Sequence, residues 1–113
     1  ELAVKSIQFN SGSDVLKQSS YNSLNQVADL MMENEFDLTL SGYTDNTGDT
    51  KFNKSLSASR AEMVMRRILE TGIAVDRLGS EGYGETHPVC PENNTDECKA
   101  KNRRVAIRVT ECK

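Results

Sequence analysis

Residues 41–61 read SGYTDNTGDTKFNKSLSASRA and join the end of a strand to the start of a helix through a polar turn. The strand is predicted from residues 36–41, where apolar and polar residues alternate strictly. If the helix begins near Asp49, three side chains share the face that looks back at the turn: Asn53, Leu56 and Arg60. The pattern therefore predicts that Asp45, on the turn, and Arg60, on the helix, lie across one small space.

The two charged residues have several possible roles. Asp45 could be an ordinary turn residue, since Asp-Asn-Thr-Gly favours turns in any protein, and an Asp45–Arg60 salt bridge could simply hold the turn to the helix. A calcium loop is disfavoured, because position 50 is not Gly and Leu56 stands where a bidentate Glu is required. In the functional alternative, Asp45 accepts from an ammonium group, while Arg60 and N–H groups of the helix start hold a carboxylate.

Hydrophobic periodicity divides the rest of the chain into further strands and helices. A β-like run covers residues 2–9, a short strand lies around residues 78–82, and residues 105–109 form a final alternating strand. A first helix begins near Ser19 or Ser20, either of which could cap it. Its predicted apolar stripe consists of Tyr21, Leu24, Val27, Ala28, Leu30 and Met31. The order β-α-β-α-β-loop-β predicts a two-layer α/β (α+β) sandwich, with both helices on one face of a mixed sheet.

Length and composition limit the possible function classes. The chain has 113 residues and no internal repeat, so we expect a single domain over residues 1–113. A net charge of −3 and the lack of Trp argue against a nucleic-acid partner. No nucleophile motif or phosphate-binding loop occurs, and we expect neither catalysis nor a cofactor. No apolar run approaches the roughly 20 residues of a membrane span, so we expect any targeting or membrane segment to lie outside this sequence.

Two cysteines flank a polar segment near the C-terminal end of the chain. Cys90 and Cys98 lie within residues 87–101, which we predict to be one long polar loop. A disulfide between them fits an oxidising compartment, whereas free thiols fit a reducing one. Zinc binding by both cysteines and His87 is disfavoured, because the spacing fits no standard zinc site. The following Asn-Arg-Arg-Val, residues 102–105, is predicted to be a solvated basic start of the final strand.

Several short motifs are spread along the chain at wide spacing. They are Gly42-Tyr43-Thr44-Asp45, Gly48, Asn53, Leu56-Ser57, Arg60-Ala61, Gly72-Ile73, Gly82-Tyr83-Gly84-Glu85, Pro88 and Asn102-Arg103-Arg104-Val105. In this combination the chain resembles the OmpA-like domain, a periplasmic module shared by outer-membrane OmpA proteins, Pal lipoproteins and MotB stator proteins. The resemblance covers nearly the whole chain, from Ile7 to Val109. It implies a βαβαββ-type fold and non-covalent binding of the peptide stem of peptidoglycan.

The resemblance also implies roles for individual residues. Asp45 and Arg60 match the two residues that grip the free amino and carboxylate groups of diaminopimelate. Four further positions match the family's pocket: Asn53 and Leu56 line it, and Thr44 and Thr47 lie where backbone contacts are made. The first loop departs from the family pattern, because residues 10–13 read Asn-Ser-Gly-Ser where an Asp or Asn often helps to close the pocket.

The implied function is non-catalytic peptidoglycan binding in the periplasm, which anchors the outer membrane to the cell wall. Attachment to the outer membrane would run through a region outside this chain. The alternative is a structural or protein-interaction module of the envelope, stator-like or for assembly, without a working peptidoglycan pocket. The sequence leaves open whether the bound stem carries diaminopimelate or lysine at its third position.

Overall fold

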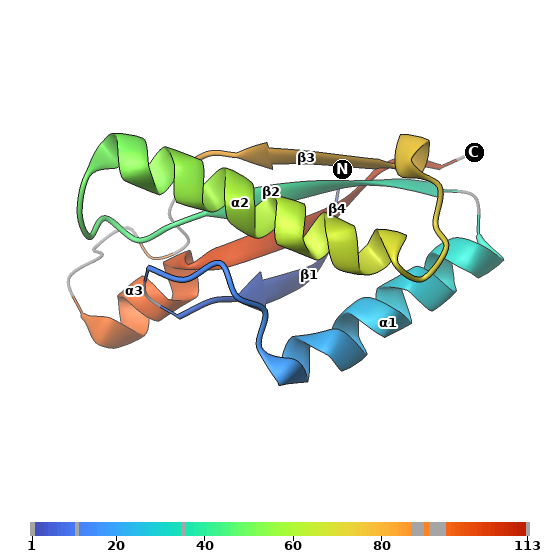
Figure 1. Ribbon diagram of the computed structural model, residues 1–113, viewed down its shortest axis with the longest axis horizontal. Coiled ribbons are helices and arrows are strands. Elements are labelled where there is room, and N and C mark those ends of the chain that lie inside the picture. The colour runs from blue at the N-terminus through green and yellow to red at the C-terminus, as the bar shows by residue number, and fades with distance from the viewer. Residues whose placement is uncertain (1, 11, 35, 87–89, 91–94, 113) are drawn as a thin grey trace.

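The structure is a computed structural model that describes residues 2–10, 12–34, 36–86, 90 and 95–112. Its elements follow one another in the order β1 (Leu2–Gln8), α1 (Gln18–Glu33), β2 (Phe36–Tyr43), α2 (Thr50–Leu69), η1 (Val75–Arg77), β3 (Leu78–Gly82), α3 (Asp96–Asn102) and β4 (Arg104–Cys112) (Figure 1). The expected order of strands and long helices is confirmed. One correction concerns α3, which lies within the segment predicted to be a polar loop. Within the described ranges, no helix is long and apolar enough to cross a membrane.

The four strands form one mixed sheet in the order β1-β4-β2-β3. β4 is antiparallel to both of its neighbours, β1 and β2, whereas β2 and β3 are parallel and are connected through α2. Both long helices lie on the same face of this sheet (Figure 1). The predicted two-layer α/β sandwich is therefore confirmed. β2 is an interior strand and ends at Tyr43. The turn that follows Tyr43 therefore begins at one end of the sheet, between the ends of β4 and β3.

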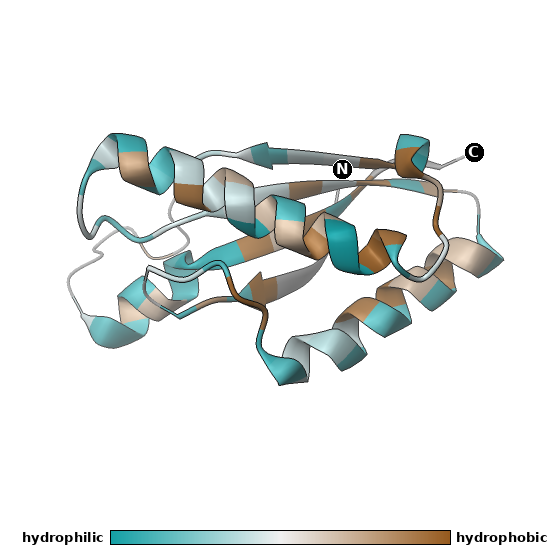
Figure 2. Ribbon diagram, viewed as in Figure 1, coloured by the Kyte–Doolittle hydropathy of each residue, from teal (hydrophilic) through white to brown (hydrophobic). Residues whose placement is uncertain are grey.

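The hydrophobic core joins residues of the sheet to residues of the two long helices. Hydrophobic positions occur along α1, α2 and the strands (Figure 2). The buried members of the core from these elements are Ile7, Leu24, Val27, Ala28, Met31, Leu38, Leu40, Ala61, Val64, Ile68, Leu78, Val105 and Ile107. The stripe predicted for the first helix is too wide, since Tyr21 is 38% exposed and Leu30 is 53% exposed. The predicted serine cap is also wrong, because Lys17 occupies the N-cap position and makes no capping side-chain hydrogen bond.

Two glycines allow α2 to lie directly on the ends of β2 and β3. A Cβ atom on Gly42 would lie 2.0 Å from the carbonyl oxygen of Ser57, and one on Gly82 would lie 2.3 Å from the nitrogen of Ala58. Both distances are far below van der Waals contact, so only glycine fits at these positions. This close approach places the first half of α2 beside the turn that follows β2.

Candidate functional site

The turn between β2 and α2 borders a cavity of about 200 Å³. All six residues singled out from the sequence line this cavity: Thr44, Asp45, Thr47, Asn53, Leu56 and Arg60. Gly12 from the first loop, together with Gly48 and Phe52, completes the lining. The cavity is smaller than the roughly 300–1,000 Å³ of pockets for drug-sized ligands. Its size therefore suits one polar end of a ligand rather than a whole extended molecule.

Asp45 supplies a buried negative charge to this cavity. Its side chain accepts from the main-chain N–H of Thr47 through Oδ1 and from Nη1 of Arg103 through Oδ2, both over 3.0 Å. Burial on its own raises the pKa of the Asp45 carboxyl, but the hydrogen bonds from Thr47 and Arg103 outweigh it and hold the pKa below its ordinary value of 3.8. Asp45 is therefore ionised at neutral pH.

Arg60 supplies a positive charge and is fully buried, with 0% of its surface exposed. Its guanidinium donates to three main-chain carbonyl oxygens: from Nε to Ser13 over 2.7 Å, from Nη1 to Tyr43 over 3.1 Å and from Nη2 to Asn10 over 2.9 Å. Burial lowers the pKa of Arg60 to about 10, although the nearby charge of Asp45 acts to raise it. Arg60 therefore remains protonated at neutral pH.

Asp45 and Arg60 border the same cavity without neutralising one another. In the described part of the chain, Asp45 forms its ion pair with Arg103. Arg60 forms no ion pair there and instead donates to three main-chain carbonyl oxygens. The hypothesis of a purely structural Asp45–Arg60 salt bridge is therefore wrong. Each terminal nitrogen of Arg60 uses one of its two N–H groups in these bonds, so two of the five guanidinium donors have no partner among the residues that the structure describes.

Asn53 and the threonines fix the shape of the turn. Nδ2 of Asn53 donates to the carbonyl of Thr47 over 3.0 Å and to Oε2 of Glu85 over 3.1 Å. The main-chain N–H of Thr44 donates to the carbonyl of Gly84 over 2.8 Å. The N–H groups of both threonines are thus used inside the protein, and the Thr44 hydroxyl donates to the carbonyl of Asp45 over 2.8 Å.

Asp49 begins α2 and takes up some of the donors expected to face a ligand. Its Oδ2 accepts from the N–H of Phe52 over 3.0 Å, and its carbonyl accepts from the N–H of Asn53 over 2.9 Å. This is the usual arrangement of an aspartate N-cap. The helix start therefore offers fewer free N–H groups than the sequence predicted, and Arg60 becomes the main cationic group inside the cavity.

A model described as the OmpA family matches residues 8–103. The chain belongs to the OmpA family. This confirms the resemblance drawn from the sequence motifs. The peptidoglycan-binding protein ArfA of Mycobacterium tuberculosis is 39% identical over 104 residues, which cover 91% of this chain and 32% of ArfA. The outer-membrane lipoprotein YfiB of Pseudomonas aeruginosa is 36% identical over 104 residues, covering 91% of this chain and 61% of YfiB.

The similarity extends to solved structures of OmpA-family domains. The C-terminal domain of MotB from Helicobacter pylori superposes with a TM-score of 0.88 at 28% identity, covering 96% of this chain and 85% of that domain. By contrast, the OmpA-family chain described here spans only about a third of the length of ArfA. The comparison therefore concerns one domain shared among longer proteins.

Besides the lining residues Gly12, Gly48 and Phe52, the sequence did not reveal the role of Arg103 beside the cavity of this OmpA-family domain. Arg103 was predicted to lie on a solvated strand start, yet its side chain is largely buried and forms the ion pair with Asp45. Its Nε also donates to the carbonyl of Phe9 over 3.0 Å, which ties β4 to the first loop. Its neighbour Arg104 is 6% exposed and lies 3.9 Å from the ring centre of Tyr43. The prediction of a solvated basic segment is wrong because both side chains pack against the protein.

The first loop holds Arg60 through its main chain. The carbonyl oxygens of Asn10 and Ser13 accept from Arg60, and Gly12 reaches the cavity. On this side of the cavity, the first loop therefore contributes main-chain carbonyls to Arg60 and a glycine to the lining.

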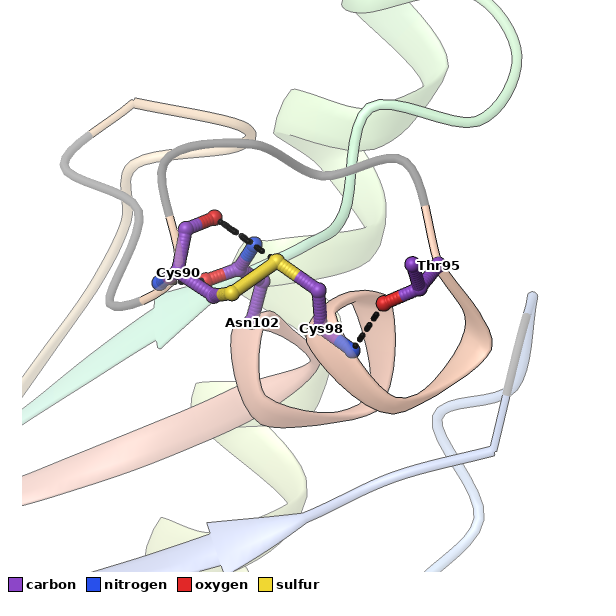
Figure 3. Close-up of a disulfide and its surroundings, with 4 residues drawn as sticks. All are labelled: Cys90, Thr95, Cys98 and Asn102. Atoms are coloured by element: carbon purple, nitrogen blue, oxygen red, sulfur yellow. Dashed lines mark hydrogen bonds between the residues drawn. A yellow bond between two sulfur atoms is a disulfide. The ribbon is translucent and has the colours of Figure 1, made fainter.

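The predicted disulfide is present. Cys90 and Cys98 are joined by a bond of 2.05 Å, and the side chain of Asn102 lies beside them (Figure 3). Both sulfur atoms are used in this bond, so neither is a thiolate that could bind zinc. His87, the third residue of the zinc hypothesis, lies outside the described residues. An oxidising compartment is the environment in which such a bond persists.

Proposed function

We propose that this domain binds peptidoglycan without catalysis, by gripping the free amino-acid end of a stem diaminopimelate. The observation that carries the proposal is the single cavity bordered by an ionised acid, Asp45, and a protonated base, Arg60, that are not paired with each other. Diaminopimelate ends in an ammonium and a carboxylate on one carbon, which is a zwitterion of matching size. The relative ArfA is a peptidoglycan-binding protein, which supports peptidoglycan as the polymer that carries this ligand.

Each charge of the site would meet the opposite charge of the ligand. The ammonium donates to Asp45, whose carboxylate oxygens keep lone pairs beyond the bonds from Thr47 and Arg103. The ligand carboxylate accepts from the two remaining N–H donors of Arg60. Asn53 holds the turn in shape, and Leu56 offers an apolar surface to the methylene groups of the ligand. Because the Asp45 and Arg60 side chains are already fixed by the fold, little ordering is needed on binding.

A tether to the cell wall follows from this binding, with the domain in the periplasm and attached to the outer membrane through a region outside this chain. The outer-membrane lipoprotein YfiB supports this location, and the disulfide agrees with it. A few charge-assisted hydrogen bonds, each worth about 1.5–3 kcal/mol, give one domain modest affinity after the costs of association. Many copies in one membrane would hold a polymeric wall far more strongly.

The test is co-sedimentation with purified peptidoglycan. Asp45→Asn keeps the size and the acceptor for Thr47 but removes the charge that meets the ammonium. We expect it to weaken binding by about 10- to 150-fold, the equivalent of one charge-assisted hydrogen bond. Asp49→Asn is the matched control, since it makes the same change in the same turn, retains an N-cap and does not line the cavity. Equal sedimentation of the two variants would refute the site.

The alternative function is that of a structural or protein-interaction module of the envelope. The similarity to the MotB domain is the observation that favours it. Titration with free diaminopimelate, followed by NMR, separates the two. Chemical-shift changes centred on residues 44–60 support the pocket. The absence of changes at millimolar ligand supports the alternative.

A further inference from the structure

A third cation, besides Arg60 and Arg103, lies at the edge of the Asp45–Arg60 cavity. Lys99, on α3, donates from Nζ to Oγ1 of Thr47 over 3.0 Å, and Thr47 lines the cavity. A hydroxyl group does not neutralise an ammonium. Among the ranges that the structure describes, no salt bridge includes Lys99, and its ammonium carries two more N–H donors than this bond uses. Within the described residues, Lys99 therefore has no ionic partner, and two of its N–H donors remain beyond the bond to Thr47.

The other two cations at the site are already engaged. Arg103 makes the ion pair with Asp45, and Arg60 is fully buried with three of its five donors on carbonyl oxygens. Lys99 alone among these three is hydrogen-bonded to a neutral side chain while remaining near the surface. A carboxylate at the mouth of the cavity would therefore form a more favourable ionic contact with Lys99 than with Arg103.

Lys99 stands on a short helix that is fixed at several points. α3 has 7 residues, too few to be stable as an isolated helix. The disulfide attaches Cys98, the residue before Lys99, to Cys90, and Thr95 caps the helix by accepting from the N–H of Cys98 over 3.1 Å (Figure 3).

The end of α3 is also held by hydrogen bonds. The buried side chain of Asn102 both accepts from the N–H of Cys90 and donates to its carbonyl, each over 2.9 Å (Figure 3). Arg103 follows directly and reaches Asp45. The disulfide and the Asn102 contacts thus fix α3 against Cys90, and Arg103 connects the end of the helix to the turn that carries Asp45 and Thr47.

We propose that Lys99 is a further ligand-binding residue, which shares with Arg60 the carboxylate at the free end of a diaminopimelate, and that the Cys90–Cys98 disulfide positions Lys99. The proposal rests on the proposed function and deepens it, because it names a determinant of ligand choice. The side chain of a lysine-type stem ends in an ammonium and lacks this carboxylate. Lys99 therefore favours diaminopimelate-type stems over lysine-type stems.

The experiment measures the affinity of the oxidised protein for two synthetic stem peptides, one with diaminopimelate and one with lysine at the third position, by isothermal titration calorimetry. Lys99→Met should weaken binding of the diaminopimelate peptide about five-fold, as expected for one partly exposed charge contact. It should leave the lysine peptide unchanged, and Lys99→Arg should restore most of the loss. Lys101→Met, the same change on an exposed position of α3, is the matched control and should have no effect.

A purely structural role gives different results. If Lys99 only restrains Thr47, Lys99→Met weakens both peptides equally and does not alter the salt dependence of diaminopimelate binding, and either result overturns the proposal. If Lys99 binds the carboxylate, raising the salt concentration weakens the wild type more than the variant. Failure of the wild type itself to bind the diaminopimelate peptide would refute the proposed function, whereas wild-type affinity in Lys99→Met refutes this inference alone.

The role of the disulfide is tested by repeating the titration after reduction. If the bond acts by positioning Lys99, reduction weakens diaminopimelate binding in the wild type and has a smaller effect in Lys99→Met, because interacting changes are not additive. An equal loss in both proteins would show that the disulfide acts on the site independently of Lys99.

Discussion

Replacement of Arg60 by methionine should unfold the protein more easily as well as weaken ligand binding. The change removes the donors of three carbonyl groups, of which the Tyr43 carbonyl lies in a buried contact and those of Asn10 and Ser13 in partly buried ones. An unsatisfied buried acceptor costs about 1–3 kcal/mol. With about 2 kcal/mol for Tyr43 and about 1 kcal/mol for each of the others, the free energy of unfolding should fall by about 4 kcal/mol.

Urea denaturation followed by circular dichroism measures this loss. Arg66→Met is the matched control on the same helix, since Arg66 is exposed and paired only with Glu62 four residues earlier. Such a surface pair contributes about 0.3–0.5 kcal/mol. A free energy of unfolding for Arg60→Met within 1 kcal/mol of the control would refute the reasoning that Arg60 holds the first loop and β2 together. Binding assays on Arg60 variants must therefore be made where the variant is folded, which is why Asp45→Asn is the cleaner test of the ligand site.

Two further predictions follow from the contacts of the site and of α2. Because the pKa of Asp45 is lower in the folded protein than its ordinary value of 3.8, ionised Asp45 stabilises the fold above about pH 5 and this contribution is lost as the pH falls through the folded-state pKa. Below pH 4, the free energy of unfolding should therefore fall less steeply in Asp45→Asn than in the wild type, as measured by acid denaturation. Identical pH dependence of the wild type and the variant would contradict the prediction. Gly42→Ala should lower the free energy of unfolding by about 3 kcal/mol or more, because its Cβ would lie 2.0 Å from a main-chain oxygen. Gly79→Ala, with nothing within 4 Å of the added Cβ, should change it little, and thermal melts of the two variants measure the difference.

The strand-turn-helix unit at residues 36–61 could be predicted because several local signals agree there. Strict alternation indicated β2, Asp49 marked the helix start, and helical spacing placed Asn53, Leu56 and Arg60 on one face. These signals act over a few residues, so the sequence reveals them without knowledge of the tertiary structure. The shared cavity was predictable for the same reason, because turn and helix face each other within one short segment.

The contacts from distant segments could not be predicted in the same way. α3 has no apolar periodicity, and its order depends on a disulfide and on Asn102, neither of which leaves a helical pattern in the sequence. Arg103 reaches Asp45 across 58 residues of sequence, which requires the register of β4 against β2 to be known. Two of the three carbonyl partners of Arg60, those of Asn10 and Ser13, likewise come from the first loop. In each case the missing information is the pairing of segments, not the chemistry of the residue.

The separate partners of Asp45 and Arg60 explain how one small cavity can keep two opposite charges available. If the two side chains were paired with each other, a zwitterionic ligand would have to break a buried ion pair before making its own contacts, and this would cost several kcal/mol. Here Arg103 and the Thr47 N–H stabilise the acid, while three carbonyl oxygens stabilise the base. In the folded protein, these contacts therefore stabilise both buried charges without a ligand. It follows that loss of Arg103 should impair binding without any contact to the ligand, because a released Asp45 could then turn toward Arg60 and close the gap between the charges.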